Sequence, residues 1–452
     1  MVARASTHAP VWTGDRAGLL FVLVAAWALV PKVVQTVTAP KYRLRVDEAE
    51  PPPTASTALV TDLLTVALLA FCLLLVLDGL RRNPRRGPLG VCLLLAPWAW
   101  VQVRGLTLDL LPGVSDLVYP AVVVAVWVVR PGLRHLRLLG YLAGAVAVGS
   151  VLVGVLLPDK GLFRALDGNV ISQEKALLPS GVLVGIFTHG NTLGQYVLLG
   201  LPLIALVPRP VVRAALVAVA LLALVWSAAR SSVGGAVALA LVAAVLSLLP
   251  AARRGVPGRL VVWAALGLVV VLPFLTTTPG AFTNRGGIWA VSLAHWRDHP
   301  WVGNGADFYT RIAQTTADLG GTVYHGHNEM VQLLVTGGVV LAVLTALLVV
   351  AAVHRVTRTP DGVQVGVALA LALAGASLLE VSLQFEAGGV FAPVLLLPLA
   401  TLLVGEPLVA DPLQAGPVHL SARGGQRPRA SVDGAPVPGR PSGNDNVLPS
   451  FP

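Results

Sequence analysis

The sequence has few charged residues. Charged side chains make up 12% of the 452 residues, whereas an ordinary soluble domain carries roughly 25%. A soluble chain of this length would form several domains, and their surfaces would need more charge than this. With a hydrophobic fraction of 55% and a mean hydropathy of +0.78, the scarcity of charge argues against a soluble protein and predicts a polytopic membrane protein.

Cysteine is also scarce, since the chain contains only Cys72 and Cys92. Both lie in apolar runs, and neither has a cysteine or histidine at the spacing of metal ligands. We therefore expect each to be a buried structural thiol.

Long apolar runs fill most of the chain. A bilayer core of about 30 Å is crossed by roughly 20 apolar helical residues. The apolar stretch 211–250 is too long for one crossing. Apart from Arg213 near its start, its one charge is Arg230, near the middle, so we expect a hairpin at this residue. The sequence thus predicts an all-α transmembrane helical bundle with about twelve spans, near 17–34, 57–80, 88–103, 113–129, 138–157, 182–207, 211–228, 231–250, 259–275, 328–353, 363–383 and 388–404.

Positive charge is concentrated in every second connection between the predicted spans. These short loops hold about 14 arginines against two acidic residues, Asp78 and Asp361. Because arginine-rich loops remain in the cytoplasm, both termini are expected to be cytoplasmic and the protein to be a multi-pass protein of the cytoplasmic membrane. The net charge of +10 is then explained by topology and anionic membrane lipids, and nucleic acid is not needed as a partner.

The two ends of the chain are expected to differ. Arg4 and Arg16 precede the first apolar run, as in a secretory signal, but no convincing cleavage site follows, so an uncleaved first span is predicted. Residues 405–452 are rich in Pro, Gly, Ser and Arg, which predicts a disordered cytoplasmic tail after a transmembrane domain at 1–404.

The longest connection, about 276–327, lies between spans nine and ten, on the outer side of the predicted topology. Residues 286–298 have the apolar spacing of an amphipathic helix at the lipid interface. Phe308, Ile312 and Leu319 indicate a second short helix. A loop of this length with its own elements is more often functional than a mere connector.

Polar residues at the end of this loop suggest chemistry. His325 and His327 stand two residues apart, next to Asn328 and Glu329, at the start of span ten. A metal site is weakly indicated, because no further ligand follows at zinc spacing. Use of one imidazole as a general base, oriented by Glu329 or Asn328, fits better, and capping of span ten is the alternative without chemistry.

Two arginines are expected on the same outer face. Arg230 either marks the hairpin and reaches the headgroups or serves a function, and Arg285 is either a solvated loop charge or a ligand-binding group. His189 and Asn191, near the outer end of span six, are most simply explained as helix caps. Two guanidinium groups near an imidazole, however, would suit a diphosphate leaving group and a hydroxyl nucleophile.

Four motifs in residues 180–345 resemble the O-antigen ligase and O-antigen polymerase superfamily of bacterial membrane glycosyltransferases. They are Gly185-Ile186-Phe187-Thr188-His189-Gly190-Asn191-Thr192-Leu193-Gly194, Ser227-Ala228-Ala229-Arg230-Ser231-Ser232, Asn284-Arg285-Gly286-Gly287-Ile288-Trp289 with His299-Pro300-Trp301-Val302-Gly303-Asn304-Gly305, and His325-Gly326-His327-Asn328-Glu329 with Gly337-Gly338. Each motif is weak alone, whereas the ordered set is fairly specific.

The resemblance implies a glycosyltransferase of cell-envelope polysaccharide biosynthesis. Its donor would be a glycan on a polyprenyl diphosphate, usually undecaprenyl diphosphate, used at the outer face of the membrane. Arg230 and Arg285 would bind the diphosphate, and His327 would help to deprotonate the acceptor, giving inverting transfer without metal or cofactor. Family members often have Gly-x-x-Gly after the His-Asn pair; here Gly338 is present but the last position is Leu341.

Several alternatives remain open from the sequence. Polymerase and ligase share these motifs, and the acceptor could be a glycan, a lipid or a protein. A multispan solute transporter has the same span number and orientation, although its polar residues usually lie at the bilayer midplane. A non-catalytic scaffold for envelope assembly would also fit the topology.

Overall fold

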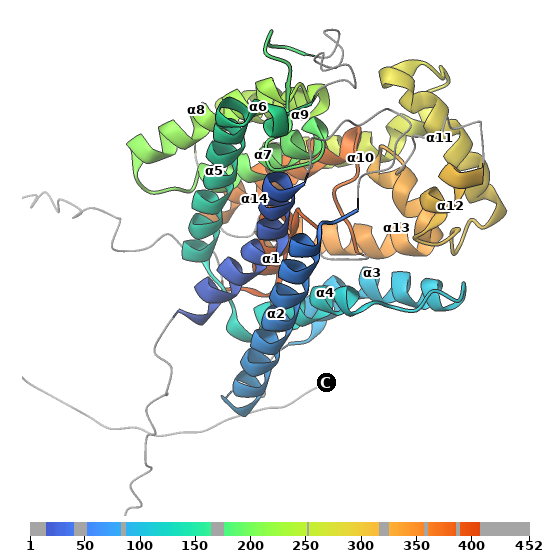
Figure 1. Ribbon diagram of the computed structural model, residues 1–452, viewed down its shortest axis with the longest axis horizontal. Coiled ribbons are helices and arrows are strands. Elements are labelled where there is room, and N and C mark those ends of the chain that lie inside the picture. Colours follow the sequence, from blue (N-terminus) through green and yellow to red (C-terminus); the bar gives the residue numbers. More distant parts are fainter. Residues whose placement is uncertain are drawn as a thin grey trace, which may run out of the picture. The chain divides into compact units, whose positions relative to one another are not determined.

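Apolar α-helices build the described part of the chain (Figure 1). The computed structural model describes residues 15–39, 52–82, 87–163, 176–250, 253–315, 325–356, 360–385 and 389–406. Each of the twelve predicted spans contains an α-helix: α1 (Arg16–Thr38), α2 (Ala55–Arg82), α3 (Leu89–Leu106), α4 (Val118–Val129), α5 (Leu133–Leu156), α7 (Gly190–Ile204), α8 (Pro210–Trp226), α9 (Arg230–Ser247), α10 (Gly255–Leu275), α13 (Glu329–Val356), α14 (Pro360–Leu378) and α15 (Leu397–Val404). The all-α transmembrane bundle is therefore confirmed.

Helix length separates these spans into groups. Seven helices, α1, α2, α3, α5, α9, α10 and α13, are long and apolar enough to cross a membrane, and α4, α8, α14 and α15 belong to shorter apolar helices. Helix α7 has 15 residues, is almost wholly buried, and packs against α5, α8, α9 and α14. At about 22 Å it is shorter than a bilayer core of about 30 Å. It forms an interior element of the bundle.

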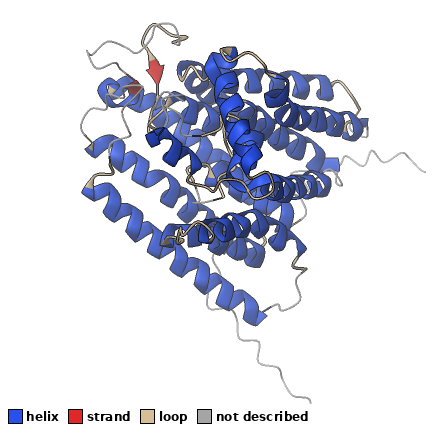
Figure 2. Cartoon of the chain, turned by 90° about the vertical axis from the view of Figure 1, so that its right-hand side faces the viewer, coloured by secondary structure: helices blue, strands red, loops and turns tan. Residues whose placement is uncertain are grey.

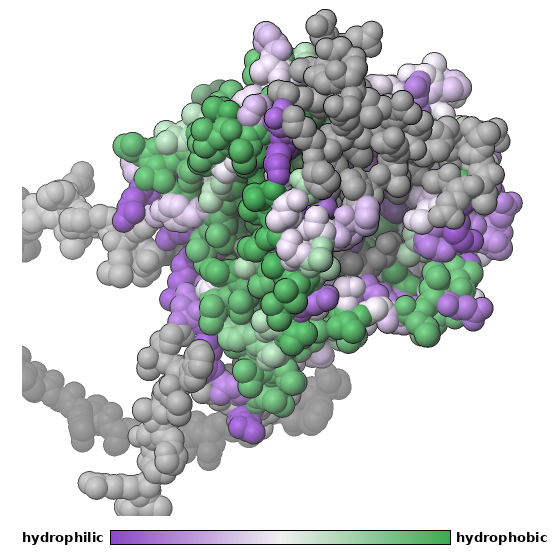
Figure 3. Space-filling view, in the orientation of Figure 1, coloured by the Kyte–Doolittle hydropathy of each residue, from purple (hydrophilic) through white to green (hydrophobic). Residues whose placement is uncertain are grey.

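The outward face of the helices is apolar. On α2 the side chains of Leu59, Leu63 and Leu74 are about 60% exposed, whereas Leu68 and Cys72, on the inward face, are buried. Figure 3 shows hydrophobic side chains over α1, α2 and α5 in the same way. Exposed apolar area on this scale marks a surface that contacts lipid.

The prediction of two buried thiols holds for one cysteine. Cys72 is buried, but Cys92 is exposed on the surface of α3. An apolar run places a residue within the membrane without telling which face of the helix it occupies. Cys92 lies on an outward face, where lipid rather than protein would cover it.

Span six begins later than predicted. The predicted span covers 182–207, but its helix, α7, begins only at Gly190. Val182–Leu183 forms strand β2 instead. This strand pairs antiparallel with β1 (Leu162–Phe163), directly after the short helix α6 (Pro158–Gly161). These two short strands are the strand content of the described chain (Figure 2). The chain before α7 is apolar because it packs against α5. This apolar character predicts a helix, but the segment is not helical.

The long connection between spans nine and ten is partly helical, as predicted. Helix α11 (Ala281–Asp298) covers the predicted range 286–298, and helix α12 (Phe308–Thr315) contains Phe308 and Ile312. Leu319, the third residue of that pattern, lies outside the described residues. The smaller elements η1 (Val114–Leu117) and η4 (Ala392–Leu396), a 3-10 turn and a π turn, precede α4 and α15.

The segment after α11 inserts into a break in α13. The backbone at Gly338 has φ 68° and ψ −169°, a conformation that only glycine adopts readily. Across the break, the Val339 amide donates to Pro300 O at 2.9 Å, and the Asn304 amide donates to Val335 O at 2.6 Å. The inserted backbone replaces helical hydrogen bonds that the break removes. It thereby provides partners for these backbone groups of α13, as a break within a membrane requires.

Helix ends that the topology assigns to one membrane face do lie together. Asn328, next to the start of α13, donates to Leu378 O at the end of α14, and Asn191 in the first turn of α7 donates to Glu380 just beyond it. Arg104 joins the end of α3 to Gly303 O in the segment after α11. At the other end, Arg16 pairs with Asp78, joining the start of α1 to the end of α2. Of the predicted tail at 405–452, residues 407–452 lie outside the described residues.

Candidate functional site

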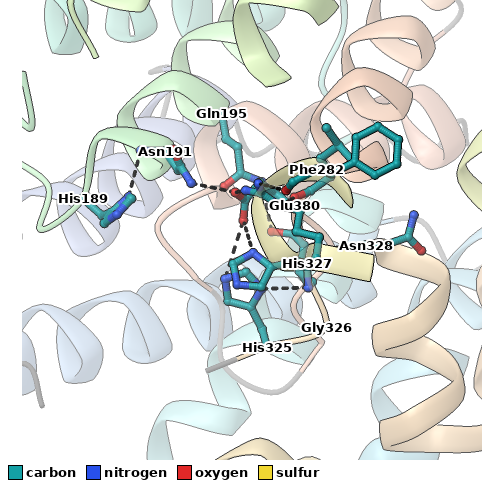
Figure 4. Close-up of polar contacts among 12 residues, drawn as sticks. His189, Asn191, Gln195, Phe282, His325, Gly326, His327, Asn328 and Glu380 are labelled. Carbon is teal, nitrogen blue, oxygen red and sulfur yellow. Dashed lines mark hydrogen bonds and ion pairs between the residues drawn. The ribbon is translucent and has the colours of Figure 1, made fainter. Parts of the chain in front are cut away.

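Four polar side chains converge on the carboxylate of Glu380 (Figure 4). Oε1 of Glu380 accepts from Asn191 Nδ2 at 2.7 Å and forms an ion pair with Arg285. Oε2 lies 3.1 Å from His327 Nδ1 and 3.7 Å from His325 Nε2. The Glu380 side chain is only 3% exposed. We call these five residues the Glu380 cluster.

A second carboxylate holds the segment that carries Glu380. Oε2 of Glu329, at the start of α13, accepts from the amides of Ser382 at 2.8 Å and Leu383 at 3.1 Å, and from Ser377 Oγ at 3.2 Å. These bonds bend the chain away from the helix, so α14 ends at Leu378 and not at the predicted 383. The bend turns Glu380 toward α7 and α11.

Arg285 is held by the backbone on both sides. Its Nε donates to Leu379 O at 2.9 Å, and its Nη1 donates to Phe282 O at 3.1 Å. The three residues before it, from Phe282 to Asn284, all have positive φ, between 53° and 66°. Such a left-handed turn of non-glycine residues is costly and is found mostly at functional sites. The turn aims Arg285 at Glu380 in a fixed orientation.

His327 is in a left-handed conformation as well, with φ 46°. Its amide donates to His325 Nδ1 at 3.2 Å, and the two rings lie 4.1 Å apart. Because a carboxylate can only accept, the 3.1 Å contact with Glu380 makes Nδ1 of His327 the donor. In the neutral imidazole, the other ring nitrogen, Nε2, then carries the lone pair that can take up a proton.

The electrostatics of the cluster favour a charged carboxylate. Burial raises the pKa of Glu380. The hydrogen bond from His327, the charge of Arg285 and the charges that His327 and His325 carry when protonated outweigh burial and lower the pKa to about 2. Burial, reinforced by the charge of His327, lowers the pKa of His325 to about 3. Glu380 is therefore ionised and His325 neutral at physiological pH.

Asn328 has a structural role. Its Oδ1 accepts from the Val331 amide at 3.1 Å and so caps the start of α13. Its Nδ2 donates to Val269 O and Leu378 O, which ties α13 to α10 and α14. Asn328 thus anchors the backbone that follows His327 and does not orient the imidazole.

The start of α7 contributes through a cap. His189 Nδ1 accepts from the Asn191 amide at 3.0 Å, as predicted for a capping residue. Asn191 projects its side-chain amide onto Glu380 instead. One turn further on, Gln195 Nε2 donates to Val381 O at 3.2 Å. The first turns of α7 therefore hold the Glu380 segment from the side opposite Glu329.

Arg230 lies at the same end of the bundle as the Glu380 cluster. It is exposed and begins α9, as the predicted hairpin requires. The turn before it packs on α7 so closely that a Cβ on Gly194 would lie 2.2 Å from Cβ of Ala229. Arg230 itself is not among the side chains that contact Glu380. The structure thus joins Arg285 and His327 directly and brings the Arg230 turn against the first turns of α7.

The donor atoms of the cluster also have the geometry of a metal site. One ligand atom each from His325, His327 and Glu380 lie within 4.8 Å of one another, and Zn²⁺ accepts two imidazoles and a carboxylate. The guanidinium of Arg285 already balances the charge of the same carboxylate. The arrangement therefore suits a charge-paired cluster at least as well as a metal.

Sequence reasoning missed Glu380 as a member of the site. The carboxylate expected to orient an imidazole was Glu329, which instead binds backbone amides. The signal available was a lone acidic residue directly after an apolar run, near the predicted outer face. An ionisable residue in such a position is a candidate functional residue in its own right.

The helices and the cluster define a multispan membrane protein with a buried charged site at one end of its bundle. Residues 215–346 match the family model described as O-antigen ligase. Arg230, Arg285 and His327 lie within this region, whereas Glu380 lies outside it. A search of curated proteins found no match to the chain. The resemblance to the O-antigen ligase and polymerase superfamily is thereby confirmed for this region, and it supports a ligase- or polymerase-like function of a bacterial membrane protein in polysaccharide biosynthesis.

Proposed function

We propose that this protein transfers a glycan from a polyprenyl diphosphate, such as undecaprenyl diphosphate, to an acceptor hydroxyl at the outer face of the cytoplasmic membrane. The observation that carries the proposal is that Arg285 and His327 bind the two oxygens of one buried carboxylate, Glu380. A cation for the leaving group and a base for the nucleophile are thus held side by side.

His327 would act as the general base through Nε2. Glu380 accepts a hydrogen bond from Nδ1, which fixes the tautomer of the ring. The same carboxylate stabilises the imidazolium that forms when Nε2 takes the proton of the acceptor hydroxyl. A base of this kind contributes roughly 10²–10⁴-fold to a rate. The acceptor oxygen then forms its bond to the anomeric carbon of the donor.

Arg285 and Arg230 would stabilise the departing diphosphate. The bond from the anomeric carbon to the diphosphate oxygen breaks as the new bond forms, and the electron pair leaves with the diphosphate. Arg285 uses three of its five N–H groups within the protein, which leaves two for a ligand. Attack opposite the leaving group inverts the anomeric centre, and the arginines supply the positive charge without a metal.

A cavity of about 490 Å³ supports a lipid-linked donor. It lies between α1, α2 and the segment before α7, and its lining includes Trp27, Phe187 and Thr188. Phe163, also in its wall, packs its ring 6.1 Å from that of His189, the cap next to the Glu380 cluster. The wall is mostly apolar and also holds Lys32, Asp159 and Lys160. Such a cavity close to the charged site suits a substrate with an isoprenoid tail and a charged head.

The charge of the loops supports an outer location of the site. The Glu380 cluster lies at the end away from the arginine-rich connections, so the positive-inside rule assigns it to the outer face, with both termini cytoplasmic. The acceptor would be a glycan, a lipid or a protein. Identifying the glycan that accumulates on the lipid carrier when the protein is removed would distinguish a polymerase from a ligase.

The proposal is tested by lipid-linked glycan transfer in membranes that contain equal amounts of each variant. We expect Arg285→Ala and His327→Ala each to lower the rate by 10²-fold or more. Arg297→Ala, an exposed arginine on the same helix as Arg285, is the matched control and should retain the rate. Unimpaired transfer in both site variants would overturn the mechanism.

A transporter would be favoured by a different outcome. Transporters place broken helices around a midplane cavity, and α13 is broken at Gly338. Here, however, the backbone of residues 299–305 fills the break. Substrate-dependent flux in proteoliposomes, with no requirement for a lipid-linked glycan, would support transport instead of transfer.

A further inference from the structure

A second cavity, of about 500 Å³, lies between the end of α3 and the outer helices α11 and α12. Its lining includes four side chains that carry or can acquire positive charge, Arg104, His295, His299 and Arg311. Phe308 and other apolar side chains complete the wall. None of these residues belongs to the Glu380 cluster, and the proposed transfer mechanism does not use them.

Arg104 is held in place and keeps donors available. Its Nε and Nη2 both donate to Gly303 O, at 3.2 and 2.9 Å, and its Nη1 donates to Thr107 Oγ1 at 2.9 Å. Three of its five N–H groups are thus engaged, which leaves two. Among the described residues no carboxylate forms an ion pair with Arg104. Its charge is therefore available to an anion that enters the cavity.

The part of the wall contributed by α11 and α12 combines a paired cation with aromatic rings. Arg311 binds Asp307 at 2.6 Å and Asn304 O at 2.6 Å, so its position is fixed. The ring of His295 packs edge-on against Phe308 at 5.3 Å. Apolar side chains beside a cation match a saccharide that carries an acidic group, since one face of a sugar ring is apolar and the acid is charged.

We propose that this cavity binds an acidic sugar residue of the glycan substrate, with the acid on Arg104 and the sugar ring against the apolar part of the wall, which includes Leu108. The inference rests on the proposed function, because it assigns part of the same substrate. His295 lies ten residues beyond Arg285 on α11, about 15 Å along the helix. A single glycan chain can therefore contact both the diphosphate site and this cavity.

A lipid headgroup is the competing source of an anion. Anionic lipids act mainly on basic segments at the cytoplasmic face. This cavity lies at the other end of the bundle, on the side of the Glu380 cluster, because Arg104 contacts the segment that follows α11. The position favours a glycan over a lipid.

The test measures binding to the full-length protein in nanodiscs of uncharged phosphatidylcholine. The probes are trigalacturonate and, as the neutral counterpart of equal length, maltotriose. We expect trigalacturonate to bind at least tenfold more tightly than maltotriose, with an affinity that falls as salt is added. Arg104→Gln should weaken its binding roughly tenfold, as for the loss of one charged hydrogen bond.

Two further variants keep the test decisive. His299→Gln alters an exposed side chain of the cavity and should also weaken trigalacturonate binding even if Arg104→Gln perturbs the fold. Arg297→Gln removes an exposed charge outside the cavity and should bind like the wild type. Equal affinity for both probes, or unchanged affinity in both cavity variants, would overturn the proposal. So would an Arg104-dependent affinity for phosphatidylglycerol without binding of trigalacturonate. The readout is independent of transfer, so failure of the proposed function would leave it interpretable.

Discussion

The Nδ1 atom of His327 lies 3.1 Å from Oε2 of Glu380, although the two residues are 53 positions apart in the chain. The pair links the start of α13 to the segment after α14. A buried carboxylate that accepts from one imidazole nitrogen prepares the other nitrogen to act as a base. The hydrogen-bonding carboxylate of His327 thus comes from outside its own sequence motif.

Glu380→Gln should lower the transfer rate by about 10²-fold or more, because it removes the charge that stabilises the imidazolium and orients the ring. The measurement is lipid-linked glycan transfer at equal expression. Asp298→Asn, which removes an exposed carboxylate at the end of α11, is the control and should leave the rate unchanged. A Glu380→Gln variant with wild-type rate would show that the pair has no part in the reaction.

The sequence predicted which residues share the outer end, but not how they are connected. Span parity placed Arg285 and His327 at one end, and the structure brings them together. Glu380 has no motif of its own, and its partners are assembled only when α7, α11 and α14 pack. The choice of Glu329 as the orienting carboxylate followed sequence proximity, whereas tertiary packing decides which acid meets the imidazole.

Apolar content located the spans but not all of their ends. Residues 182–189 are as apolar as a span, yet Gly185 has φ 63° and a Cβ there would lie 2.3 Å from Cβ of Ser150. The segment is apolar because it packs on α5 without being helical. Similarly, α14 ends at Leu378 because Glu329 captures the amides that would continue the helix. Hydropathy reports burial, and these boundaries depend on hydrogen bonds between distant parts of the chain.

Gly338→Ala should destabilise the protein by about 3 kcal/mol or more, because its backbone conformation is accessible mainly to glycine. An added Cβ would also lie 2.2 Å from the backbone carbonyl of Trp301. Thermal unfolding in detergent is the measurement. Gly267→Ala, in the middle of α10 with open space around it, is the control and should be neutral or slightly stabilising. Equal melting temperatures for the two variants would contradict the insertion of residues 299–305 into the break of α13.

Acid should destabilise the folded protein in two overlapping steps that begin at different pH. The pKa of His325 is about 3 in the folded state against 6.5 for a free imidazole, so the unfolded state takes up a proton first and stability falls as the pH drops from 6.5 toward 3. The pKa of Glu380 is about 2 against 4.5, so its contribution is present above pH 4.5 and is lost only as the pH falls toward 2. Between pH 7 and 5, only His325 of this pair should make the stability change with pH.

Melting temperatures measured from pH 7 to pH 5 test this order. The wild type should lose stability over this range, and His325→Asn should lose less. Glu380→Gln lowers overall stability but should retain the slope, since Glu380 does not titrate there. A slope that is unchanged in His325→Asn would contradict a neutral, desolvated His325 in the folded state.

Removal of metal should leave transfer unaffected. His325, His327 and Glu380 offer three ligand atoms within 4.8 Å, but Arg285 already supplies the positive charge that Glu380 balances. We therefore expect dialysis against a chelator to change the transfer rate by less than about twofold, within the variation of an intact site. Added micromolar Zn²⁺ should instead inhibit, because it would displace the Nδ1 proton of His327 and compete with Arg285 for the carboxylate. Transfer that is lost on chelation and restored by a metal ion would make the same three groups a catalytic metal site and would overturn the arginine-based mechanism.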